Sequence, residues 1–95
     1  MALRIQMHFT GQLARAAGER ERVLEVPDGS TLGDLILALA RGEGGEFASL
    51  LLDAGGRPRS TTLRVVDGQQ IPPGADGLAL EDGAEVMLMT PIAGG

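Results

Sequence analysis

The sequence predicts an α+β roll, in which a mixed sheet packs on one main helix. Three observations support this fold class. Alternating or apolar runs typical of strands occur near both ends of the chain, while only one segment has a strong helical period. A single amphipathic helix must bury its apolar stripe, and a sheet face is the compact way to do so. With 95 residues, we expect one domain spanning residues 1–95.

The N-terminal third predicts two paired strands. Residues 3–9 alternate between apolar and polar side chains, which indicates a half-buried strand. Residues 22–26 indicate a second strand, closed by the turn signal at 27–29. The alanine-rich segment 10–18 predicts one or two helical turns between them. We therefore expect the two strands to pair antiparallel.

The main helix is expected to start after Thr31. Thr31 is a suitable N-cap, and Asp34 at the third helical position favours a capping box. The apolar residues that follow lie at i, i+3, i+4 and i+7, on one helix face: Leu32, Leu35, Ile36 and Leu39. Arg41-Gly42 is a stop signal, and residues 42–45 are expected to form a glycine-rich loop.

The second half predicts a short helix and three strands. The helix is expected to begin near Phe47 and to end near Gly55-Gly56. Strands are expected at 62–67, 69–71 and 84–89, with a hairpin turn at Asp67-Gly68. Of these, the strand at 84–89 is expected to lie beside the first strand in the middle of the sheet.

Composition excludes several classes of function. Phe9 and Phe47 are the only aromatic residues, so platforms for stacking on bases are missing. The net charge of −5 disfavours binding to a phosphate backbone and favours a basic partner. The chain has no cysteine, which excludes disulfides and thiol catalysis, and His8 is its only histidine, which argues against a metal site. Without a signal peptide or an apolar run of membrane-spanning length, we expect a cytoplasmic protein.

The strand at 84–89 predicts a surface for a partner. If Val86 and Leu88 point at the helix, Met87 and Met89 lie on the opposite, outer face of the sheet. Exposed methionines are common on adaptable binding surfaces. We therefore expect Met87 and Met89 to contact a partner protein.

The tail, residues 90–95, is expected to be flexible and to carry the reactive group. It ends in Gly94-Gly95, and glycine has no Cβ, so this segment can enter a channel too narrow for other residues. The expected reactive group is the terminal carboxylate of Gly95. The basic residues are all arginines. An activated terminus therefore cannot be attacked by a lysine side chain of the same chain or of another copy of it.

The order of elements and the last sixteen residues resemble the MoaD/ThiS family of sulfur carriers. These are ubiquitin-like proteins with the β-grasp fold. The resemblance is carried by Thr31 opening a helix with Leu32 and Leu35, and by the sequence Leu80-Glu81-Asp82-Gly83-Ala84-Glu85-Val86 followed by Pro91-Ile92-Ala93-Gly94-Gly95. Ala84 departs from the usual second acidic residue of this turn. The segment 71–78 is longer than in the shortest members and is similar to members related to the CysO carrier.

The resemblance implies a mechanism in which the catalysis belongs to partner enzymes. A partner related to ubiquitin-activating enzymes adenylates the Gly95 carboxylate with ATP and magnesium, and a sulfur donor converts it to a thiocarboxylate. A second enzyme accepts the sulfur during biosynthesis. The same resemblance implies roles for the other tail residues. Gly94 keeps the tail narrow, Ile92 and Ala93 pack at the entrance of the partner's channel, and Pro91 restricts the first bend of the tail. The chain itself is expected to be a carrier, not an enzyme, with no cofactor bound.

The sequence leaves two alternatives and the pathway open. The same tail chemistry would serve a ubiquitin-like modifier that is joined to lysines of target proteins. A β-grasp binding module with an inert tail is the other alternative. Molybdopterin and cysteine synthesis are the favoured destinations of the sulfur, and no residue separates them.

Overall fold

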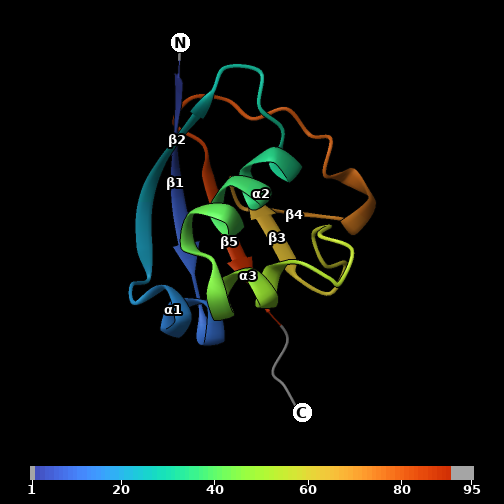
Figure 1. Ribbon diagram of the computed structural model, residues 1–95. Coiled ribbons are helices and arrows are strands. Elements are labelled where there is room, and N and C mark those ends of the chain that lie inside the picture. Colours follow the sequence, from blue (N-terminus) through green and yellow to red (C-terminus); the bar gives the residue numbers. More distant parts are fainter. Residues whose placement is uncertain (1, 91–95) are drawn as a thin grey trace.

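The computed structural model describes residues 2–90, which form a five-stranded sheet with its helices packed against one face (Figure 1). The strand order is β2-β1-β5-β3-β4. The elements in chain order are β1 (Ala2–Phe9), α1 (Gly11–Ala17), β2 (Glu21–Pro27), α2 (Leu32–Glu43), α3 (Gly45–Leu51), β3 (Leu63–Val66), β4 (Gln69–Ile71), the 3₁₀ turn η1 (Pro73–Ala75) and β5 (Glu85–Met89).

The first and last strands lie side by side in the middle of the sheet, as predicted. β1 pairs in parallel with β5, from Gln6 opposite Glu85 to Phe9 opposite Leu88. β1 also pairs antiparallel with β2, and β5 pairs antiparallel with β3. Strands β3 and β4 form a hairpin whose turn residues, Asp67 and Gly68, have φ angles of 50° and 84°. Positive φ at both positions is the geometry that matches the twist of paired strands, so this turn signal is confirmed.

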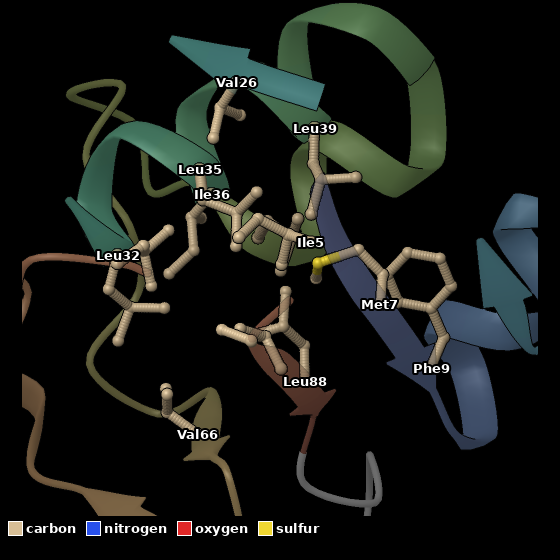
Figure 2. Close-up of a cluster of buried hydrophobic side chains, with 14 of the residues drawn as sticks. Ile5, Met7, Phe9, Val26, Leu32, Leu35, Ile36, Leu39, Val66 and Leu88 are labelled. Atoms are coloured by element: carbon tan, nitrogen blue, oxygen red, sulfur yellow. The ribbon is translucent and has the colours of Figure 1, made fainter. Parts of the chain in front are cut away.

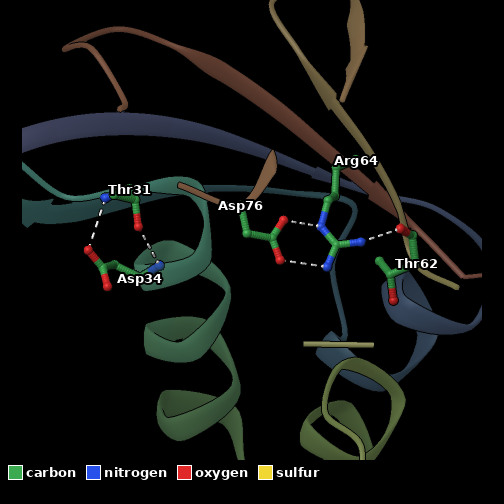
Figure 3. Close-up of polar contacts among 5 residues, drawn as sticks. All are labelled: Thr31, Asp34, Thr62, Arg64 and Asp76. Carbon is green, nitrogen blue, oxygen red and sulfur yellow. Dashed lines mark hydrogen bonds and ion pairs between the residues drawn. The ribbon is translucent and has the colours of Figure 1, made fainter. Parts of the chain in front are cut away.

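Helix α2 is fixed at its N-terminus by a capping box, as predicted. The Thr31 hydroxyl accepts a hydrogen bond from the Asp34 N–H at 3.2 Å, and the Asp34 carboxylate accepts one from the Thr31 N–H at 3.0 Å (Figure 3). Two further N–H groups of the first turn donate to loop carbonyls: Leu32 to Leu78 at 2.9 Å, and Gly33 to Asp76 at 2.8 Å. All four bonds satisfy backbone donors that a helix start leaves free.

The predicted glycine-rich loop at 42–45 is wrong. Helix α2 continues through Gly42 to Glu43, and the break before the next helix is confined to Gly44 and Gly45, whose φ angles are 63° and 51°. Helix α3 begins at Gly45 and ends at Leu51, earlier than the predicted end near Gly55-Gly56. It stops there because Leu52 is extended and forms a β-bridge with Pro58, while Asp53 accepts the N–H groups of a tight turn.

The core lies between the inner face of the sheet and the helices (Figure 2). The four apolar residues of the predicted helix face are buried, and they meet Ile5, Met7, Val86 and Leu88 from the two central strands. Phe9 and Phe47 meet edge to face, with ring centroids 5.3 Å apart. Each such side chain stabilises the fold by about 1.5–3 kcal/mol when it is fully buried.

An ion-pair cluster around Arg22 lies at the start of the edge strand β2. Arg22 pairs with Glu19 at 2.5 Å and with Glu43 at the end of α2, and its guanidinium lies 5.9 Å from the centre of the Phe9 ring. Burial lowers the pKa of Arg22, but hydrogen bonds and attraction from Glu19 and Glu43 outweigh this and hold the pKa above its ordinary value. Arg22 therefore stays charged at any working pH.

None of the helices within residues 2–90 has the length and apolar character needed to cross a bilayer.

Candidate functional site: the outer face of β5 and the tail root

Met87 and Met89 lie on the outer face of the sheet, where the alternation along β5 places them. Val86 and Leu88 are fully buried against the helices, whereas both methionines are half-buried. Met87 is opposite His8 on β1 and Val65 on β3, and Met89 is opposite Leu63. We define the outer patch as Leu63, Val65, Met87 and Met89.

The outer patch is apolar at its centre and polar at its border. A shallow depression of about 230 Å³ is lined by His8, Val65, Gly68, Glu85 and Met87. His8 lies 3.5 Å from Glu21, which places an acidic group at the β2 side of the patch. Leu63 is 42% exposed and lies opposite Met89, so apolar surface continues from β5 onto β3. An apolar centre with a polar rim is typical of surfaces that bind another protein.

Leu63 and Val65 were missed as candidate site residues. Their strand, Leu63–Val66, has apolar residues at both odd and even positions. The alternation of polar and apolar residues therefore did not distinguish its inner face from its outer face. The register that aligns Leu63 with Met89 and Val65 with Met87 supplies the missing information. Val23, on the outer face of the edge strand β2, is even more exposed, at 50%, but it lies two strands away from Met87.

Arg64 lies between Leu63 and Val65 in β3. Its side chain is buried on the inner face of the sheet, with 1% exposed. Its guanidinium makes a two-point ion pair with Asp76, at 2.7 Å for Nε–Oδ1 and 2.9 Å for Nη2–Oδ2 (Figure 3). Its third nitrogen donates to the Thr62 carbonyl at 2.7 Å. Because the Asp76 carbonyl also accepts from Gly33, this pair connects β3 to the start of α2.

The tail root is the edge of the sheet at which β5 ends. β1 and β5 are parallel, so both finish at this edge, and α1 and α3 lie beside it (Figure 1). Thr90 follows β5 directly. The predicted tail contacts of Pro91, Ile92 and Ala93 and the predicted reactive residues Gly94 and Gly95 lie outside the described residues, and their roles stay predictions. The partner contacts of Met87 and Met89 also stay predictions.

The acidic residues of two turns serve the backbone. Asp82 accepts the Arg4 N–H at 2.8 Å, and Asp67 accepts the Glu85 N–H at 2.9 Å. Within residues 2–90, no three potential metal-ligating side chains come together. A wider hollow, about 680 Å³, is an open depression beside α1 and the loop before β2, and its charged residues are Arg15, Glu19 and Arg20.

This sequence and this fold were compared with known proteins. A family model described as the ThiS family matches residues 7–95. A search of curated proteins gives no match. Among solved structures, SAMP1 from Haloferax volcanii is similar, with 26% identity over 97% of this chain and 99% of that chain and a TM-score of 0.84.

Two further structures share the fold at lower identity. Urm1 from Trypanosoma brucei is 22% identical over 99% of this chain and 97% of that chain, with a TM-score of 0.76. A putative molybdopterin converting factor, subunit 1, from Pyrococcus furiosus is 18% identical over 95% and 99%, with a TM-score of 0.75. These neighbours are ubiquitin-like β-grasp proteins, so the predicted fold is confirmed. Because the family model covers the chain from residue 7 to residue 95, this protein belongs to the ThiS family.

Proposed function

We propose that this protein is a sulfur carrier whose Gly95 carboxylate is adenylated by a ubiquitin-activating-type partner and then converted to a thiocarboxylate. Members of the family work with such activating enzymes and with sulfur-accepting enzymes. The observation that carries the proposal is the family match, which includes Gly94-Gly95 at its end. Molybdopterin or cysteine synthesis is the proposed destination of the sulfur.

The structure supports the proposal through the position of β5. The strand that leads toward Gly95 is central, with paired strands on both sides, so its end is held by the whole sheet. The outer patch lies on the same strand and on its β3 neighbour, directly before the tail root. A partner that docks on this patch would therefore contact the strand that ends at Thr90, where the tail begins.

The chemistry asks for an activated carboxyl group and for no catalytic side chain on the carrier. A carboxylate is a poor electrophile, and transfer of AMP from ATP converts it to a mixed anhydride with a good leaving group, releasing pyrophosphate. A sulfur nucleophile then attacks the carboxyl carbon and releases AMP. In this proposal ATP and magnesium are bound by the activating partner, and the carrier contributes position and thinness.

Intact mass after incubation with the activating enzyme, ATP and a sulfide source tests the proposal. We expect a mass gain equal to the exchange of one oxygen for sulfur, located on the C-terminal peptide. A chain that lacks Gly95 should keep the fold and should lose the gain. An unchanged mass with an enzyme that is active on another carrier would reject the proposal and favour a binding module with an inert tail.

A protein modifier is the second candidate, because the similar SAMP1 structure belongs to a protein named small archaeal modifier protein 1. An activated Gly95 carboxylate would then acylate a lysine of a target and release AMP. The two functions differ in their products. Conjugates of higher mass that carry the Gly95 linkage in a cell lysate would support the modifier, whereas a thiocarboxylate without conjugates would support the carrier.

A further inference from the structure

The two edges of the sheet differ in how they are protected. An edge strand has N–H and C=O groups that no neighbouring strand uses, and proteins normally blunt such edges. At one edge, β4 has only three residues and is followed directly by Pro72-Pro73, which cannot donate hydrogen bonds. At the other edge, β2 extends over seven residues and has β1 as its only neighbouring strand among residues 2–90 (Figure 1). The longer of the two edges is therefore the open one.

The strand register identifies the backbone groups of β2 that face away from the sheet. The Phe9 N–H donates to the Arg20 carbonyl at 2.8 Å, so these two residues form a hydrogen-bonded pair. Such pairs alternate with pairs that do not exchange hydrogen bonds in an antiparallel ladder. By this alternation the N–H and C=O groups of Glu21, Val23 and Glu25 point away from β1. We call these three residues the β2 edge; each has one donor and one acceptor for an added strand.

The side chains of the β2 edge define the kind of strand that fits. Val26, at the other parity, is buried on the inner face, so Glu21, Val23 and Glu25 lie on the outer face. Val23 is 50% exposed, and an exposed glutamate lies two residues away on each side of it. The residues of an added strand would lie directly opposite, with Cβ atoms about 5 Å away. The β2 edge therefore matches an apolar residue between two basic residues.

The charged neighbours on β1 leave the two glutamates accessible. Arg4 is opposite Glu25, and His8 is opposite Glu21. The His8 ring lies 3.5 Å from the Glu21 carboxylate, yet 68% of the Glu21 side chain is exposed. Both β1 residues are on the sheet side of the glutamates, so the side that an added strand would occupy stays open.

A second copy of this chain does not fit the β2 edge. Two antiparallel β2 strands related by a twofold axis must place residues of the same face opposite each other. With the axis at Val23, each Glu21 would face a Glu25, and like charges directly opposite each other are destabilising. With the axis at Leu24, Val23 would face Glu25, which offers neither an apolar contact nor an opposite charge. The charges therefore favour a basic segment of a different protein.

We propose that the β2 edge binds an extended segment of a partner protein as an additional strand, with an apolar side chain opposite Val23 and a lysine or arginine opposite both Glu21 and Glu25. Main-chain hydrogen bonds supply affinity in this mode of binding, and alternate side chains supply specificity. Strands β2 and β1 separate the added strand from β5, a distance of about 14 Å. The site is thus distinct from the outer patch, and it goes beyond the proposed function and does not depend on it.

A synthetic peptide tests the proposal on the ¹⁵N-labelled full chain. The probe is a capped peptide of seven residues with lysine, valine and lysine at alternate positions and threonine elsewhere. By NMR at millimolar peptide, we expect the amide signals of Glu21, Val23 and Glu25 to shift and their hydrogen exchange to slow about fivefold, the size of one hydrogen bond. The Gln70 amide on the blunted edge strand β4 should not respond.

Two outcomes of this titration would overturn the proposal. If the three β2 amides do not respond, the glutamates serve only to keep copies of the chain apart. If the same peptide N-methylated at its valine binds equally well, the contact is not a strand addition, because that peptide cannot donate a hydrogen bond to the Val23 carbonyl.

Exchanging the charges gives a second readout. The double variant Glu21→Lys with Glu25→Lys should bind the lysine peptide about tenfold more weakly, and it should bind the matching glutamate peptide instead. Glu46→Lys with Glu81→Lys is the matched control, because it changes the net charge equally at exposed positions outside β2. Equal weakening by the two double variants would show general attraction to an acidic chain and would reject a specific site.

Discussion

The two faces of β5 differ in burial although they belong to alternate residues of one five-residue strand. Val86 and Leu88 on the inner face are completely buried in the core, while Met87 and Met89 on the outer face are only half-buried. The inner residues hold the central strand in place through apolar packing. The outer residues leave apolar area that residues 2–90 do not fully cover. The comparison teaches that alternation alone lets one strand bury one face in the core and leave its other face at the surface.

Leu88→Ala is expected to have the largest effect on stability. It removes most of a fully buried side chain at the centre of the sheet and leaves a cavity, which costs about 2–5 kcal/mol of unfolding free energy. Met89→Ala, the neighbouring change on the outer face, should cost less than about half as much because Met89 is half-buried. Urea denaturation of both variants measures the difference, and equal losses would contradict the division between the faces.

Asp76→Ala is expected to have the next largest effect, because it leaves the buried Arg64 charge without its partner. Removing one member of a buried pair costs about 3–5 kcal/mol, and we expect about 2–3 kcal/mol here because a quarter of the Asp76 side chain is exposed. The double variant Arg64→Met with Asp76→Ala should recover much of the loss, since it removes both charges. A double variant no more stable than D76A in thermal unfolding would refute this account.

Met87→Glu should weaken binding to the activating partner about tenfold while changing stability by less than about 1 kcal/mol. A charge at the centre of an apolar contact must be desolvated when the partner docks. Val23→Glu is the matched control, because Val23 is an exposed apolar residue of the same face but lies on the edge strand. Surface plasmon resonance gives both affinities. Equal weakening by the two changes would mean that the outer patch is not the contact surface.

Thr31→Ala is expected to have the smallest effect, about 1 kcal/mol of unfolding free energy. The change removes the hydroxyl side of the capping box, while the loop carbonyls of Asp76 and Leu78 still accept the first N–H groups of α2. Thr31→Ser should retain nearly full stability because it keeps the oxygen. Guanidinium denaturation distinguishes the variants, and a loss as large as that of L88A would mean that the cap supports more of the fold than local bonding accounts for.

Local features account for the part of the fold that was predicted correctly. The capping box at Thr31 and Asp34 joins residues three apart, and the apolar face of α2 repeats within one segment. The alternation in β1 and β5 identified two strands whose inner residues form the core. The Gly42 stop failed because a glycine costs a helix only about 1 kcal/mol, which packing of the last turn outweighs.

The sequence by itself determined the main helix, its cap, the central strands and the candidate face that carries Met87 and Met89. Only the tertiary structure decided which face of β3 is buried. An arginine flanked by Leu63 and Val65 belongs outside by polarity, yet Arg64 is buried because Asp76, twelve residues later, supplies its counter-charge. Periodicity describes one segment at a time, whereas these contacts depend on register between segments far apart in the chain.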